Sequence, residues 1–347
     1  MRLDILDSTI LLLWIQLACS AAIILFAATQ LTKNADVIAF KTGLGRSFVG
    51  VVLLATATSL PELGTGVSAV SLVGGPDGAN LAAGDAFGSN LFNLLIIGII
   101  DILWRNGSII SGLGVSVGLV GILGVLVIGV AASSILIHMH TDFMSDLIVS
   151  PMSFVVLVVF ILALYAIYRE EKSSDSEDVD VDYSDESLTR AFFIYGIAAL
   201  IVVGAAIWLA QTGNGIANEM GWGKSFVGTQ FLALSTSLPE LAASIAALRI
   251  MAPELAITNV LGSNLFNMGF VLFLDDVAYT DGPIWNSVST IHVFTAVLAM
   301  VMTMVVLVPL IGKSKLSFGR IVSLEAGLLI GLYVVGSILV FVSGGHG

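Results

Sequence analysis

The stretch S-F-V-G-V-V-L-L-A-T-A-T-S-L-P-E-L, residues 47–63, returns as S-F-V-G-T-Q-F-L-A-L-S-T-S-L-P-E-L at 225–241. The two copies share 12 of 17 residues, and each places a proline and a glutamate inside an apolar run. The string G-S-N-L-F-N follows each copy, at 88–93 and 262–267. Because an ionisable residue in the middle of a hydrophobic helix marks a candidate functional site, the duplicated glutamates are the first residues to consider.

The composition places this pair of motifs in a membrane protein. The chain has 347 residues, of which 57% are hydrophobic and only 11% charged, whereas soluble domains carry about 25% charged residues. We therefore expect a multi-pass protein of the cell membrane, with the lipid bilayer as its surroundings. The single cysteine, Cys19, excludes an intramolecular disulfide, and we expect it to be a buried, inert thiol.

Ten apolar runs are long enough to cross a hydrocarbon core, which takes about 20 helical residues. They fall at about 9–31, 47–73, 79–102, 109–137, 147–168, 190–211, 225–250, 253–275, 285–311 and 319–343. The predicted fold is therefore an all-α membrane protein of ten transmembrane helices. We divide it into a first five-helix repeat (1–168, motif 47–93), an acidic cytoplasmic linker (169–189) and a second five-helix repeat (190–347, motif 225–267).

Lysine and arginine predict the orientation. With ten spans, one side of the membrane holds eleven of these residues and the other only Arg2 and Lys224. The positive-inside rule therefore puts both termini outside and the linker in the cytoplasm. The two motif helices then cross in opposite directions, so the repeats are inverted, as in secondary transporters. The linker holds nine acids at 170–186 without EF-hand spacing, which favours a solvated connector over a calcium sensor.

The candidate site is built from oxygen atoms. Spacings of three and four place one set of side chains on a single helix face in each motif, and Pro61 and Pro239 remove the usual N–H donors for the carbonyls of Ala57 and Ser235. Oxygen ligands without nearby His or Cys suit a hard cation such as Ca²⁺ or Na⁺. The two faces comprise Ala55, Thr58, Ser59 and Glu62, and Ala233, Thr236, Ser237 and Glu240.

The second string adds a polar face on the next span. Its members at four-residue spacing are Asp85, Ser89 and Asn93 in the first half and Asn259, Ser263 and Asn267 in the second. Asn90 and Asn264 point elsewhere, and we interpret them as packing or helix-bonding groups. Asp85 is an accessory candidate that could equally cap its helix or line a vestibule.

Electrostatics predicts how the site works. An unpaired carboxylate at mid-membrane costs several kcal/mol, and neither copy of the repeated stretch, 47–63 or 225–241, contains Lys or Arg. Glu62 and Glu240 must therefore be protonated or neutralised by a metal ion. One divalent cation matches two carboxylates. Its departure requires protons or monovalent cations to replace it, which is the coupling of an antiporter.

These motifs resemble those of the cation/calcium exchanger superfamily, and most closely those of the prokaryotic sodium/calcium exchangers. The alpha-repeats of that superfamily carry G-T-S-x-P-E and G-S-N, which stand here at 57–62 with 88–90 and at 235–240 with 262–264. The resemblance implies a core of spans 2, 3, 7 and 8, with spans 1 and 6 sliding against it. It also implies that both glutamates bind Ca²⁺ and Na⁺ alternately. The further implied ligands are the Thr58 and Thr236 carbonyls for Ca²⁺, the Ala55 and Ala233 carbonyls and the Ser59, Ser237, Ser89 and Ser263 hydroxyls for Na⁺, and Asn93 and Asn267 at the centre.

The chain departs from the family pattern at Ala57 and Ser235, which replace glycines, and at Asn267, where some members have aspartate. A proton/calcium exchanger is the alternative within transport, with H⁺ as the counter-ion. A cation channel or an intramembrane aspartyl protease, suggested only by Gly84-Asp85, is less well supported. Scattered basic residues give no nucleic-acid surface. We expect a monomer without cofactors that is not an enzyme.

Overall fold

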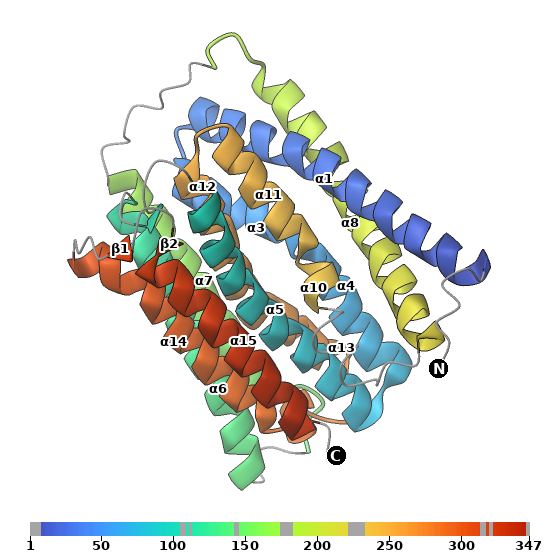
Figure 1. The fold of residues 1–347 in the computed structure, drawn as a ribbon. Coiled ribbons are helices and arrows are strands. Elements are labelled where there is room, and N and C mark those ends of the chain that lie inside the picture. The colour runs from blue at the N-terminus through green and yellow to red at the C-terminus, as the bar shows by residue number, and fades with distance from the viewer. Residues whose placement is uncertain are drawn as a thin grey trace.

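The computed structural model describes residues 8–104, 109–110, 113–141, 146–173, 183–220, 233–312, 317–318 and 322–344. The described chain is almost entirely helical (Figure 1). The α-helices are α1 (Ser8–Thr42), α2 (Arg46–Val49), α3 (Ala55–Thr58), α4 (Leu60–Ser68), α5 (Gly75–Leu103), α6 (Val115–His140), α7 (Pro151–Ser173), α8 (Leu188–Glu219), α10 (Ala233–Thr236), α11 (Leu238–Arg249), α12 (Pro253–Phe266), α13 (Leu272–Ala278), α14 (Ile291–Gly312) and α15 (Leu324–Gly344). The described chain also contains three π-helical turns: η1 (Gly50–Leu54), η2 (Ala69–Val73) and η5 (Asn267–Val271). It contains in addition the 3₁₀ turn η6 (Ile284–Asn286) and two antiparallel strands, β1 (Ser317–Phe318) and β2 (Val322–Ser323).

Each of the ten predicted spans corresponds to a helix or a broken helix. Seven of the described helices are long and apolar enough to cross a membrane, and the bent pair Arg46–Thr58 and Leu60–Val73 makes an eighth. The prediction ended the first span at residue 31, but α1 continues to Thr42. It does so because Asp36, although acidic, is 1% exposed and pairs with Arg46 just beyond the helix. Residues 174–182 of the predicted linker and 225–232 of the second motif lie outside the described residues.

The helices form a buried centre and a peripheral pair. Of the 18 most apolar consecutive residues in each span, 72% are buried in α5 and 83% in the span formed by α12 and α13. The corresponding shares are only 17% in α1 and 28% in α8. The peripheral helices α1 and α8 run antiparallel along one side of the bundle (Figure 1), since Gln16 contacts Trp208 and Lys41 bonds to Ser184. Cys19 is exposed on α1, so the expectation of a buried thiol was wrong; the apolar segment presents it outward.

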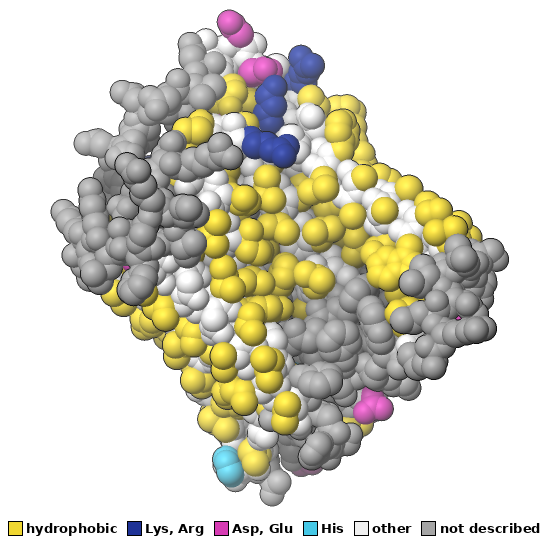
Figure 2. Space-filling model, viewed as in Figure 1, with side chains coloured by type: hydrophobic (Ala, Val, Ile, Leu, Met, Phe, Trp, Pro, Cys, Tyr) yellow, Lys and Arg dark blue, Asp and Glu magenta, His cyan; other side chains and the backbone are white. Residues whose placement is uncertain are grey.

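The outer surface is that of a protein in lipid. Figure 2 shows apolar side chains over most of the described part of one face, with Lys and Arg side chains gathered near one end. Large apolar side chains such as Phe26 and Leu200 are 71% and 75% exposed. Such a surface would drive aggregation in water and is stable in a bilayer.

A pair of aspartates reveals the repeat beyond the two motifs. Asp101 accepts a hydrogen bond from the N–H of Ile109, eight residues later, and Asp276 accepts one from Ile284, also eight residues later, both at 2.7 Å. Ser323, just before α15, donates to Asp101. In the same way, Ser150 and Ser153 at the start of α7 donate to Asp276. Each aspartate therefore fastens the third span of its own half to the fifth span of the other half.

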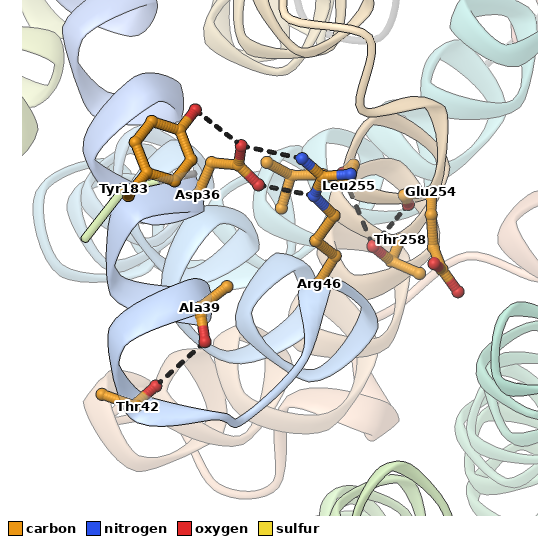
Figure 3. A network of polar contacts seen from close by, with 8 residues as sticks. All are labelled: Asp36, Ala39, Thr42, Arg46, Tyr183, Glu254, Leu255 and Thr258. Carbon is orange, nitrogen blue, oxygen red and sulfur yellow. Dashed lines mark hydrogen bonds and ion pairs between the residues drawn. The ribbon is translucent and has the colours of Figure 1, made fainter. Parts of the chain in front are cut away.

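A polar network holds the turn between α1 and the first motif (Figure 3). Arg46 donates to both oxygens of Asp36 at 2.6 and 2.9 Å, and the Tyr183 hydroxyl donates to the same carboxylate at 3.0 Å. Burial, and then the charge of Asp36, raises the pKa of Tyr183 to about 12. The network therefore ties the residues before α8 to the α1–α2 turn.

Candidate ion-binding centre

Both motif helices break at the serine that precedes Leu-Pro-Glu. Ser59 has φ −91° and ψ 5°, and Ser237 has φ −87° and ψ 8°. The two parts of the first motif helix are bent by 41° at this point. Proline follows two residues later in each half and cannot donate to the carbonyl four residues before it. The repeated geometry indicates that both halves place a helix N-terminus, with its glutamate in the first turn, at the same depth.

The two broken helices meet through reciprocal hydrogen bonds. The Ser59 hydroxyl donates to Oε1 of Glu240, and the Ser237 hydroxyl donates to Oε1 of Glu62, both at 3.1 Å. All four side chains have no exposed surface. Because each serine reaches the glutamate of the other repeat, the two carboxylates lie on either side of an approximate two-fold axis at the centre of the bundle.

The asparagines of the second strings repeat this exchange. Asn93 donates to Asn264 Oδ1 at 3.0 Å, and Asn267 donates to Asn90 Oδ1 at 3.5 Å. Asn264 also donates to the Asn90 carbonyl at 3.2 Å, which confirms that Asn90 and Asn264 bond neighbouring helices. These contacts hold α5 against the α12–η5 junction and fix the orientation of the Asn93 and Asn267 amides.

The serines of the second strings reach the same centre. Ser263 donates to Oε1 of Glu240 at 3.2 Å, and Ser89 lies 3.5 Å from the Thr236 hydroxyl. The Ala55 and Ala233 carbonyls each accept the serine N–H four residues later, at 2.9 and 3.0 Å. Each of these carbonyls also accepts a hydroxyl, from Thr58 and Thr236 respectively, at 3.3 Å.

Asp85 lies inside the cluster. It is 1% exposed, and its two oxygens accept hydrogen bonds from Thr236 at 3.2 Å and Thr65 at 2.8 Å. The alternatives of a helix cap or an exposed vestibule are therefore wrong, because α5 begins at Gly75, ten residues earlier. In the other half, Thr58 makes the equivalent contact with Asn259 at 3.3 Å.

Four oxygens of the cluster have no hydrogen-bond donor. They are Glu62 Oε2, Glu240 Oε2, Asn93 Oδ1 and Asn267 Oδ1, two from each repeat, and all are buried. Within the described part of the chain the only ion pair is Arg46–Asp36, so no basic side chain neutralises the glutamates. No group of three His, Cys, Asp or Glu side chains suited to a metal occurs among the described residues. Two carboxylates with neutral amide and hydroxyl oxygens instead suit a hard cation.

The structure thus brings all the predicted site residues into one buried cluster at the crossing of the two repeats. The sequence reasoning missed Thr65, which binds Asp85, and Asp275 of α13, which is fully buried with both oxygens unpartnered. The only sequence signal for Asp275 is an Asp-Asp pair near the end of an apolar run.

Broken helices from two repeats that meet at buried acids are the architecture of secondary transporters. The sodium/calcium exchanger protein family matches residues 12–169 and 190–342, and the chain belongs to that family.

Three proteins are similar to this chain. The inner membrane protein YrbG of Escherichia coli is 30% identical over 256 residues, which cover 73% of this chain and 75% of YrbG. The sodium/calcium exchanger MaX1 of Methanosarcina acetivorans is 35% identical over 81 residues, 23% of each chain. The solved structure of the sodium-calcium exchanger NCX_Mj superposes with a TM-score of 0.71 at 18% identity, covering 94% of this chain and 98% of that one. This last likeness concerns the fold.

Proposed function

We propose that this transporter exchanges Ca²⁺ for Na⁺ across the membrane, with both ions using the centre between Glu62 and Glu240. The observation that carries the proposal is the reciprocal pairing of each glutamate with the serine of the other repeat. Each carboxylate thereby keeps one oxygen fixed by a hydroxyl and one without a donor. A divalent ion that binds both bare oxygens neutralises two charges that would otherwise be unpaired in a non-aqueous interior.

Alternating access follows from the same arrangement. The peripheral helices contact the motif helices of the opposite repeat, as Thr32 of α1 donates to the Ala243 carbonyl and Tyr195 of α8 donates to the Leu53 carbonyl. A shift of the antiparallel α1–α8 pair would therefore act on both broken helices together. We propose that this shift exposes the centre to one side of the membrane at a time.

We also propose that both termini face outward. The described basic residues at helix ends gather at one end of the bundle, and Figure 2 shows such a gathering on one face. The helix ends that carry Lys41, Arg46, Lys172, Arg190 and Arg249 lie together, since Lys41 bonds to Ser184 before α8, Ser47 bonds to Glu254 after α11, and Glu171 packs on Gly45. The positive-inside rule makes that end cytoplasmic.

The exchange should be electrogenic. Ca²⁺ leaves two central carboxylates neutral, whereas three Na⁺ would leave one positive charge, so each 100 mV would contribute roughly 2.3 kcal/mol. Asn267 in place of an aspartate leaves no third carboxylate at the inner position of the second repeat.

Radioactive calcium uptake into proteoliposomes tests the proposal. Purified protein is reconstituted and given an outward gradient of Na⁺, K⁺ or protons in turn, with the membrane potential set by valinomycin. The proposal predicts uptake driven by Na⁺ and changed by the potential. Uptake driven by protons at fixed Na⁺ would instead make the protein a proton/calcium exchanger, and uptake without any counter-ion would make it a channel.

A further inference from the structure

Asp275 is the buried acid that the central site does not use. It lies on α13 with no exposed surface, and neither of its carboxylate oxygens has a hydrogen-bond partner. Its neighbour Asp276, by contrast, accepts hydrogen bonds from Ser150, Ser153 and Ile284. Asp276 therefore has a structural role, whereas nothing in the described chain compensates the burial of Asp275.

The Asp275 carboxylate lies against α4, the helix whose Thr65 binds Asp85. A Cβ added to Gly66 would sit 2.5 Å from Asp275 Oδ1, so the carboxylate packs directly on this glycine. The preceding residue, Thr65, donates to Asp85 Oδ2 at 2.8 Å. Asp85 and Asp276 are the charged groups that act electrostatically on Asp275. Helix α4, which packs against α13, thus contacts both carboxylates beside the centre.

This pair has no counterpart in the other half of the molecule. In the first motif helix Thr58 donates to Asn259, and in the second Thr236 donates to Asp85. Asn259 is therefore the counterpart of Asp85. Asp101 corresponds to Asp276 by its contacts, which makes Ile100 the counterpart of Asp275. The additional acids therefore lie on one side of the centre only, beside α4 and α13.

We propose that Asp275 and Asp85, with the hydroxyls of Thr65 and Thr236, form a second cation site that adjoins the Glu62–Glu240 centre, and that it takes a monovalent hard cation such as Na⁺. Two buried carboxylates without a basic partner are stable only when protonated or compensated by a cation, and the bare oxygens of Asp275 offer a cation its ligands. Asp85 already accepts two hydroxyl hydrogen bonds, so Asp275 supplies the one bare carboxylate. A single bare carboxylate with a few neutral oxygens offers fewer ligands than the six to eight that Ca²⁺ takes. The role of this ion as a counter-ion rests on the proposed exchange.

Equilibrium binding of radioactive Na⁺ to the purified full chain tests the second site, in Asp275→Asn and in Gly66→Ala. The glycine variant keeps the carboxylate but pushes it away with a methyl group. Its matched control is Gly64→Ala in the same helix, where an added Cβ meets nothing within 4 Å. We expect Asp275→Asn to lose one bound Na⁺ per chain, Gly66→Ala to weaken that binding about tenfold, which corresponds to about 1.4 kcal/mol, and Gly64→Ala to match the wild type.

Calcium binding measured without Na⁺ separates this proposal from the exchange itself. Asp275→Asn should bind Ca²⁺ within about threefold of the wild type, a change of less than about 1 kcal/mol. An unchanged Na⁺ count in Asp275→Asn would overturn the second site. If Asp275→Asn does not fold, equal Na⁺ binding in the two glycine variants would overturn it. Failure of the wild type to bind Ca²⁺ would instead overturn the proposed exchange, while the Na⁺ count would still report on Asp275.

Discussion

Replacing Ser237 by alanine should weaken calcium binding more than replacing Ser59. The Ser237 hydroxyl donates to Glu62 at 3.1 Å, and no other side chain among the described residues donates to that carboxylate. Glu240 receives Ser59 at 3.1 Å and also Ser263 at 3.2 Å. Ser237→Ala therefore leaves Glu62 without a side-chain donor, whereas Ser59→Ala leaves Glu240 with one.

A hydrogen bond to a charged group is worth about 1.5–3 kcal/mol. Because the lost bond fixes the orientation of the Glu62 carboxylate, the full value should appear in Ser237→Ala as a Ca²⁺ dissociation constant higher by roughly ten- to a hundredfold. In Ser59→Ala the remaining Ser263 contact should limit the change to roughly tenfold or less.

Isothermal titration of Ca²⁺ into the purified protein without Na⁺ measures both values. Ser68→Ala is the matched control, since this serine lies on the exposed side of α4 and donates to the Gly64 carbonyl. It should bind Ca²⁺ as the wild type does. The reasoning would be refuted by an unchanged affinity in Ser237→Ala, or by a larger loss in Ser59→Ala than in Ser237→Ala.

Two further predictions concern the supports of the fold. Asp276→Ala should lower the stability of the protein in detergent by about 2–6 kcal/mol. The substitution leaves the buried N–H groups of Ser150 and Ile284 without an acceptor, which costs about 1–3 kcal/mol for each group. An unchanged melting temperature would contradict this prediction. The pKa of Tyr183 is raised to about 12 in the folded chain, so the unfolded chain loses this proton first as the pH rises. The wild type therefore loses stability between about pH 10 and 12. Tyr183→Phe, which has no such proton, should lose less stability in that window. An identical alkaline unfolding profile in the variant and the wild type would count against that contact.

The centre could be predicted because its residues are duplicated. Two copies of a Pro-Glu pair in apolar helices are improbable without a function, and inverted repeats of secondary transporters place such residues at a shared site, which predicts that Glu62 and Glu240 meet. The sequence could not predict that Ser59 would reach Glu240 and not Glu62, since spacing along one helix does not reveal contacts between helices.

The parts that sequence reasoning missed depend on local departures from regular helix. The π-helical turn η5 adds one residue between Asn267 and Asp276, so the offset between equivalent residues changes from 174 at the asparagines to 175 at the aspartates. A regular 3.6-residue count past Asn267 therefore misplaces Asp275. The extension of α1 to Thr42 depends on the Asp36–Arg46 pair, which hydrophobicity alone does not indicate.

The number of calcium ions bound at equilibrium tests the central claim most directly. Radioactive Ca²⁺ binding is measured on the purified wild type, on Glu62→Gln and Glu240→Gln, and on Glu254→Gln, a control acid that accepts the Ser47 hydroxyl away from the centre. If the two glutamates share one ion, the wild type and Glu254→Gln should each bind Ca²⁺ at the centre, and neither Glu62→Gln nor Glu240→Gln should do so. Retention of that binding in either central variant would contradict the account.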